Sequence, residues 1–193
     1  MKTKKRCLWP HDDQKMILYH DTEWGVPIHN DRKIFEFLVL ESAQAGLSWR
    51  TILYRRNGYK KAFAHFDPKK VARFSKKDIE RLLKDVGIIR NRLKILATVN
   101  NAQRFIEIQK EYGSFSRYMW QFVQRKPLDG KRRTSKDIPA ITPEAELLSK
   151  DLKNRGFKFM GPTIVYAHMQ AVGMVNDHTI DCFRYREIKR SVK

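Results

Sequence analysis

The chain of 193 residues has only two cysteines, Cys7 and Cys182, and they lie near opposite ends of the sequence. A disulfide-stabilised scaffold has more cysteines at closer spacings, so that class of protein is excluded. Acidic side chains are also scarce: 21 Asp and Glu stand against 40 Lys and Arg, giving a formal net charge of +19. So large an excess predicts a polyanionic partner, above all nucleic acid, and a soluble protein that is merely basic is the alternative.

Long apolar runs are missing too. No stretch is long enough to span a bilayer, and the basic residues 1–6 are followed by Trp9, Pro10 and acidic residues instead of the apolar core of a signal peptide. No predicted helix combines a basic face with a wholly apolar one, which disfavours a role at a membrane surface. We therefore expect a cytoplasmic protein with no membrane partner.

Signals for β-structure are weak. No segment alternates convincingly between apolar and polar residues, and no Asn-Gly or Asp-Gly hairpin joins two β-rich runs. The sequence also contains no internal repeat. We expect an all-α fold with a single domain over residues 1–193, basic tails at 1–6 and 184–193, and irregular structure at 7–30 and 124–141.

Signals for helices recur along the rest of the chain. Asp31 is a plausible N-cap for one helix, which ends at Gly46, and Trp49 begins the next. Ser75 and Asp78 form a capping signature for another. Further helices are expected at about 90–112, with Leu93, Leu96, Val99, Ala102 and Ile106 facing inward, and at 115–123, 143–155 and 162–173.

One carboxylate falls on the apolar face of the predicted helix that Asp31 opens. Glu41 lies on the same stripe as Ile34 and Leu38. A buried glutamate can be a structural partner of Arg or Lys, and it can also be a functional group, because perturbed buried carboxylates cluster at functional sites. The residues alone leave both interpretations open. For Tyr19 and Trp49, the residues alone favour plain core packing over a role in binding.

A turn bounded by glycines precedes the last predicted helix. Gly156 and Gly161 permit backbone conformations that other residues avoid, and Pro162 suits the first position of a helix. Backbone N–H groups at a helix start bind anions, and Lys158 lies between the two glycines. The turn therefore predicts a phosphate contact.

Potential metal ligands gather near the two ends of the chain. Cys7 and His20 lie near the N-terminus, and His178 and Cys182 lie near the C-terminus, four residues apart and on one face if that segment is helical. Two sulfurs and two imidazoles are a usual set for a tetrahedral structural zinc ion. The alternative is a pair of buried free cysteines with satisfied histidines.

More specific motifs are spread over nearly the whole chain, at residues 6–9, 19–27 (YHDTEWGVP), 40–49 (LESAQAGLSW), 85–90, 148–153, 156–163 (GFKFMGPT) and 175–178. In these segments and their order the chain resembles the DNA-3-methyladenine glycosylase I family of DNA repair enzymes. The resemblance implies a helix-hairpin-helix DNA glycosylase fold with one structural zinc ion joining the two termini. The ligands it implies are Cys7, His20, His178 and Cys182.

The resemblance also implies a base pocket and a DNA-binding surface. Glu41 corresponds to the glutamate that recognises the base, and Tyr19 and Trp49 correspond to the aromatic residues of the pocket. A glycine–leucine step that fills the gap left in the duplex corresponds to Gly46 and Leu47. The DNA-binding residues implied are thus Gly46, Leu47, Lys158 and Gly161.

Two positions depart from related enzymes. Met16 stands where they often carry a tyrosine that faces the base, and we keep it as a base-binding position because a thioether can pack on a ring. Asn176 stands where the wider superfamily has an essential aspartate. Because 3-methyladenine is cationic in DNA and already a good leaving group, a strong general base is not needed. We expect Glu41 to be the catalytic residue, through its electrostatic preference for the cationic base.

The expected activity is the hydrolytic excision of 3-methyladenine from alkylated double-stranded DNA. The base is flipped out and released as free 3-methyladenine, and an abasic site remains. No lysine is obviously placed to form a Schiff base, so the expected enzyme is a monofunctional glycosylase acting as a monomer. The alternatives are a non-catalytic zinc-stabilised nucleic-acid-binding module and an RNA- or protein-interaction role based on charge.

Overall fold

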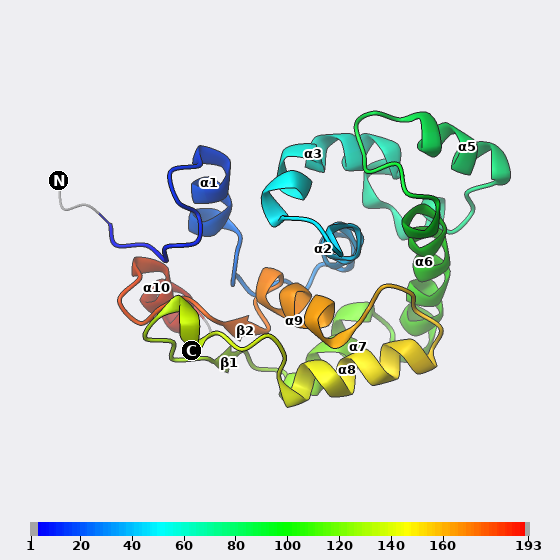
Figure 1. Cartoon of the computed structure of the whole chain (residues 1–193). Helices are drawn as coiled ribbons and strands as arrows, with labels where there is room; N and C mark the ends of the chain where they lie inside the picture. Colours follow the sequence, from blue (N-terminus) through cyan, green and yellow to red (C-terminus); the bar gives the residue numbers. More distant parts are fainter. Residues whose placement is uncertain (1–3, 192–193) are drawn as a thin grey trace.

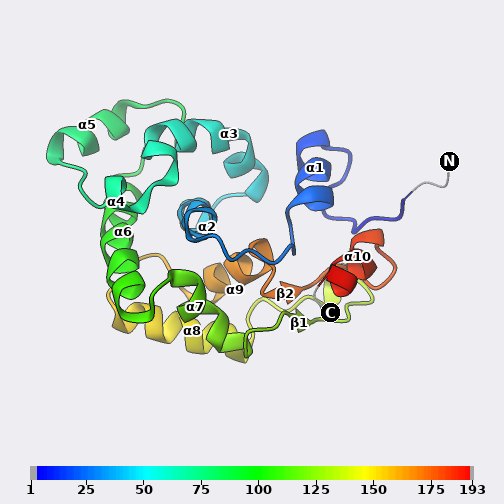
Figure 2. The same cartoon turned by 180° about the vertical axis from the view of Figure 1, so that it is seen from behind.

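The computed structural model describes residues 4–191, which are mostly helical (Figures 1 and 2). Of the predicted basic tails, residues 1–3 and 192–193 lie outside the described residues. Between residues 4 and 191, no helix is both long and apolar enough to cross a membrane. The helices are α1 (Gln14–Thr22), α2 (Asp31–Gln44), α3 (Trp49–Ala62), α4 (Pro68–Val71), α5 (Lys76–Lys84), α6 (Arg92–Tyr112), α7 (Phe115–Trp120), α8 (Pro143–Asn154), α9 (Pro162–Ala171) and α10 (Phe183–Ser191).

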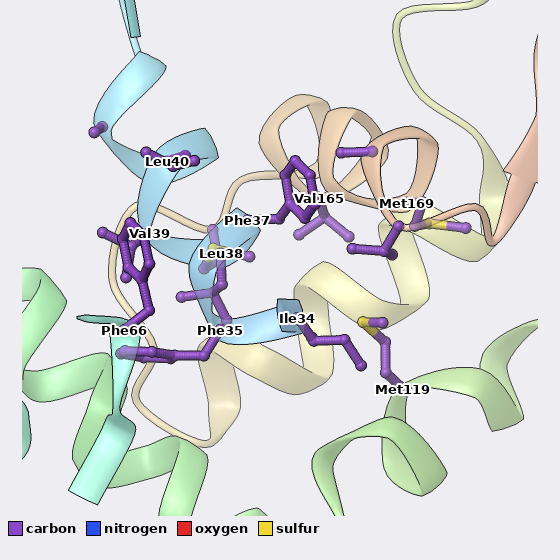
Figure 3. Close-up of a cluster of buried hydrophobic side chains, with 14 of the residues drawn as sticks. Ile34, Phe35, Phe37, Leu38, Val39, Leu40, Phe66, Met119, Val165 and Met169 are labelled. Carbon is purple, nitrogen blue, oxygen red and sulfur yellow. The ribbon is translucent and has the colours of Figure 1, made fainter. Parts of the chain in front are cut away.

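Helix α2 forms the centre of the molecule, and from Ile34 to Ala43 every side chain except that of Glu36 is buried (Figure 3). Helices α3, α6, α7 and α9 pack around it. A helix that is apolar on every side is stable only when it is covered on every side. Burial continues to Glu41, Ser42 and Ala43 near the C-terminal end of α2, so Glu41 is enclosed like its apolar neighbours. The apolar side chains of this stretch are Ile34, Phe35, Phe37, Leu38, Val39 and Leu40.

Helix α6 has nearly the predicted bounds, but its predicted buried face is only partly right: Ala102 is buried and Val99 packs against the core, as expected. Leu93 and Leu96, expected inside, are 67% and 44% exposed. Ile95 and Phe105 are buried instead, together with Asn101. The reason is that a polar side chain occupies the inner face, so a count of apolar residues alone misplaces the stripe.

Asn101 is buried because it holds the turn between α8 and α9. Its Oδ1 accepts from the Lys158 N–H at 2.8 Å, and its Nδ2 donates to the Lys158 carbonyl at 2.8 Å. Asn100 donates to the carbonyl of Gly156, also at 2.8 Å. Gly156 has φ +85°, a left-handed conformation that favours glycine. Gly161 has an ordinary φ of −67°, so the special backbone predicted there is not found.

Four elements named below differ from the sequence-based expectation. Residues 14–22, predicted to be irregular, form α1, whose N-terminal N–H groups donate to the Asp13 side chain. Two short strands, β1 (Leu128–Asp129) and β2 (Val175–Asn176), pair in parallel and tie the long loop to the C-terminal segment. Residues 184–191 of the expected C-terminal tail belong to α10, which is anchored by buried Tyr185 and Ile188.

Replacing Asn101 by alanine should destabilise the fold, because both backbone groups of Lys158 would lose their partner. A lost partner for part-buried polar groups costs about 1–3 kcal/mol. Urea denaturation of Asn101→Ala beside Lys110→Ala, a change at an exposed position of the same helix, measures this cost. Equal stability of the two variants would mean that the asparagine does not hold the turn.

Candidate active site and metal cluster

A pocket of about 370 Å³ opens where α1, α2, α3 and α9 meet the loop that follows β1. Its walls are mostly aromatic and apolar, with a few polar groups among them, which is the usual character of a small-molecule site. Four aromatic side chains contribute to it. The lining residues are Trp9, Tyr19, Trp24, Glu41, Gln44, Trp49, Ser135, Ile138, Ala167 and Gln170.

Glu41 is the only carboxylate in this lining, and it is 3% exposed. Its Oε2 is buried without a hydrogen-bond partner, and within residues 4–191 no Lys or Arg forms an ion pair with it. The alternative of a structural ion pair is therefore wrong for this glutamate. Burial raises the pKa of Glu41 to about 8, so the free protein holds a neutral carboxyl group at neutral pH. A cation entering the pocket would favour its ionised form.

The pocket aromatics form a corner and not a pair of parallel walls. The ring centroids of Tyr19 and Trp49 are 5.1 Å apart at an interplanar angle of 46°, which leaves no room for a third ring between them. Trp9 and Trp24 meet at 5.1 Å and 72° beside them. A planar base would therefore stack on one of these rings and meet the others along their edges. Burial also raises the pKa of the Tyr19 phenol well above its usual value, which keeps it neutral.

Met16 and Asn176 do not line this pocket. Met16 is buried on α1 and faces a neighbouring depression, which it lines together with Asp13 and Arg50. Asn176 is buried in β2, where its Nδ2 donates to the Tyr185 carbonyl at 3.2 Å. This amide holds α10 in place.

A polar network that sequence reasoning missed reaches the pocket through Gln170. Buried Asp177 accepts hydrogen bonds from Arg132 Nε at 2.8 Å, from Gln170 Nε2 at 2.8 Å and from the Tyr166 hydroxyl. Because the side-chain amide nitrogen of Gln170 donates to Asp177, the side-chain oxygen of Gln170 is the group that can contact a ligand in the pocket. Gly130 lies so close that a Cβ there would be 2.2 Å from Asp177 Oδ1. No spacing rule joins these segments, so only the fold reveals them.

The candidate DNA-binding residues lie on two turns that both touch α6. Gly46 has φ +76°, and the next residue, Leu47, is 39% exposed just before α3. Lys158 and Gly161 lie on the turn between α8 and α9. Both turns are exposed connections on a rigid helical scaffold, the usual place for binding residues.

The four predicted metal ligands come together, and their ligand atoms lie within 4.8 Å of one another. Cys182 Sγ is 3.6 Å from both His20 Nε2 and His178 Nδ1, and Cys7 Sγ is 3.6 Å from His178 Nδ1. With metal–sulfur bonds of about 2.3 Å and metal–nitrogen bonds of about 2.0–2.1 Å, a tetrahedral site has sulfur–nitrogen separations of about 3.6 Å. His178 and Cys182 lie on a turn and not on the predicted helix, yet both reach the cluster.

The surroundings orient the ligand atoms of the cluster. His20 Nδ1 lies 2.8 Å from Asp21 Oδ1, and Asp21 is in turn held by Arg6. His178 Nε2 donates to the Trp24 carbonyl at 3.0 Å. Each imidazole thus uses one nitrogen for the protein and turns the other toward the sulfurs, as in metal sites with oriented histidines. The donor set and its geometry fit one bound metal ion.

Comparison with known proteins gives a consistent picture. Residues 9–185 match the methyladenine glycosylase family model. The chain is 46% identical over 181 residues to DNA-3-methyladenine glycosylase 1 of Escherichia coli strain K12, covering 94% of this chain and 97% of that protein.

Solved structures agree with this similarity. A crystal structure of 3-methyladenine DNA glycosylase I has a TM-score of 0.90 and 46% identity, covering 93% of this chain and 98% of that one. A single-substitution variant of 3-methyladenine DNA glycosylase I, solved in complex with 3-methyladenine, has a TM-score of 0.90 and 40% identity, covering 92% and 96%.

The raised pKa of Glu41 predicts a pH-dependent stability. Between its ordinary pKa of 4.5 and about 8, the folded chain keeps a proton that the unfolded chain has lost, so the free energy of unfolding falls as pH rises through this window. The Glu41→Gln variant lacks this group. Its stability relative to the parent protein should grow across the window, by at most about 1.4 kcal/mol per pH unit. Urea denaturation at several pH values checks this; parallel curves would exclude a buried proton on Glu41.

Proposed function

Because this chain belongs to the methyladenine glycosylase family, we propose that it excises 3-methyladenine from alkylated double-stranded DNA by hydrolysis of the N-glycosidic bond. The products are free 3-methyladenine and an abasic site. The observation that carries the proposal is a carboxyl group, Glu41, buried without a partner in an aromatic pocket. Such a group gains most from a flat cationic ligand.

A base inside a duplex cannot reach this pocket, so the nucleotide must rotate out of the helix. The excess of Lys and Arg attracts the phosphate backbone. Lys158 and Gly161 place the turn between α8 and α9 against that backbone, and Gly46 allows Leu47 to enter the space that the base leaves. These contacts hold the duplex open while the base is in the pocket.

Recognition of the base combines stacking with charge. Either Tyr19 or Trp49 supplies the ring face on which the base stacks, a contact worth about 1–3 kcal/mol, and the other ring meets the edge of the base. Glu41 ionises when a cationic base enters, so 3-methyladenine gains an ion pair that neutral adenine cannot form. Met16 is buried on α1 outside the lining, and we assign it no contact with the base.

The chemistry follows from the charge of the substrate. The glycosidic bond breaks with its electron pair moving onto the base, which leaves as neutral 3-methyladenine, and water adds to the C1′ cation and loses a proton. Glu41 is the catalytic residue in the sense that it selects and orients the leaving base. Asn176, in β2, is outside the pocket, so its amide does not activate the water.

Zinc is the ion that best suits two thiolates and two imidazoles. All four coordination positions would be filled by Cys7, His20, His178 and Cys182, so the ion would be structural and would join the two ends of the chain. We propose one zinc ion per chain in a monomeric enzyme of the cytoplasm.

A non-catalytic zinc-stabilised nucleic-acid-binding module is the competing function. Such a module could use the same basic surface and the same turns, but it has no need for a buried carboxyl group without a partner. Burying such a group costs stability, and a protein that only binds the DNA backbone gains nothing in return. The pocket therefore favours the enzyme.

Incubation with methylated duplex DNA, followed by chromatography of the free bases, tests the activity. We expect release of 3-methyladenine, and a loss on the order of 100-fold in the Glu41→Gln variant, comparable to the removal of one electrostatic group from an active site. Glu146→Gln, a change at an exposed carboxylate on α8, serves as the control. If Glu41→Gln keeps both its rate and its preference for the methylated base, Glu41 does not have this role.

Elemental analysis tests the metal separately. We expect one zinc ion per chain, and we expect Cys182→Ser to lose both the ion and thermal stability, because metal binding and folding are coupled. A Cys182→Ser variant that keeps the metal and melts at the same temperature would contradict the site.

A further inference from the structure

A lysine on α6 reaches across to the end of the central helix. The Nζ of Lys94 donates to the carbonyls of Ala43 at 2.8 Å and Ala45 at 2.6 Å. Partial burial lowers the pKa of this ammonium group. Ala45 is the residue just before Gly46 and Leu47, so Lys94 holds the base of the turn that carries Leu47.

The position of Lys94 is unfavourable for its own helix. It lies in the first turn of α6, where the helix dipole disfavours a cation and where no acidic residue compensates. Helix α2, in contrast, has no basic residue in its last turn, although the last carbonyls of a helix lack partners within it. Lys94 therefore stabilises the C-terminal end of α2, while its charge is unfavourable at the start of α6.

Helix α6, which carries Lys94, also contacts the second DNA-binding turn, the one between α8 and α9. Asn100 and Asn101 follow Lys94 by six and seven residues, about 10 Å along the helix, and hold the backbone of Gly156 and Lys158. One rigid helix is thus hydrogen-bonded to both turns. Their separation is set by the spacing of these side chains on α6.

We propose that Lys94 is a positioning residue for base extrusion. It fixes the turn of Leu47 relative to the turn between α8 and α9, so that Leu47 enters the duplex at the place where the other turn holds the backbone. The inference rests on the proposed function, and in particular on the insertion of Leu47. Without the ammonium group, the carbonyls of Ala43 and Ala45 turn to water and the turn loses its fixed distance from α6.

The test compares Lys94→Met with the parent protein, both carrying their metal, in three measurements. Release of 3-methyladenine from methylated duplex DNA should fall about 10- to 100-fold, since a displacement of about 1 Å can cost that much. The affinity for free 3-methyladenine, followed by tryptophan fluorescence, should not change, because the pocket is intact. The salt dependence of duplex binding should also not change, because Lys94 bonds to carbonyls and not to phosphate.

Two further variants complete the comparison. Lys94→Arg retains a donor for the two carbonyls and should recover part of the rate, whereas Lys110→Met, at an exposed lysine of the same helix, should behave like the parent protein. Combining Lys94→Met with Leu47→Ala should lower the rate no further than Leu47→Ala alone, because both changes remove the same insertion.

Each contrary result has a separate meaning. A full duplex rate in Lys94→Met, or an equal loss in its affinity for the free base, overturns the positioning role. If the slope of log K against log salt concentration for duplex binding is smaller by about one in Lys94→Met, Lys94 contacts a phosphate instead. If Leu47→Ala leaves the duplex rate unchanged, the insertion proposed for Leu47 fails first, and the role of Lys94 fails with it.

Discussion

A carboxyl group without a partner, buried on the central helix of the protein, is the constraint that organises this molecule. Burying Glu41 costs free energy that the surrounding core must supply, and the enclosed side chains of α2 provide it (Figure 3). The same burial makes the group responsive to charge. A neutral carboxyl group buried among aromatic side chains discriminates between a cationic and a neutral base more strongly than a solvated carboxylate could.

The metal cluster and the base pocket are parts of one structure. His20 faces the cluster and the preceding residue, Tyr19, lines the pocket. Trp24 also lines the pocket, and its carbonyl accepts from His178. The cluster lies where α1 approaches α10, at one end of the molecule (Figure 1). A metal ion there would therefore fix one wall of the pocket, even though it has no open position for chemistry.

Short-range patterns in the sequence predict most helices. The resemblance predicts the four metal ligands, which converge in space, and it also predicts Glu41, which lies in the pocket. The predicted buried face of α6 is partly wrong because Asn101 is buried there and hydrogen-bonds to a turn far along the chain. No local sequence pattern contains that contact. Helix α1 is missed because its buried residues include His20, which a hydrophobic count ignores. Gln170 and Asp177 are connected only by the fold. The roles of Tyr19, Trp49, Leu47 and Lys158 remain predictions.

Difference infrared spectroscopy of the parent protein against Glu41→Gln observes the protonation of Glu41 directly. We expect a protonated-carboxyl band in the free protein at neutral pH that disappears with a midpoint near 8. The band should also be lost at neutral pH when methylated duplex DNA binds. A midpoint near the ordinary value of 4.5 would instead mean that Glu41 is a solvated or paired carboxylate and not a buried neutral group.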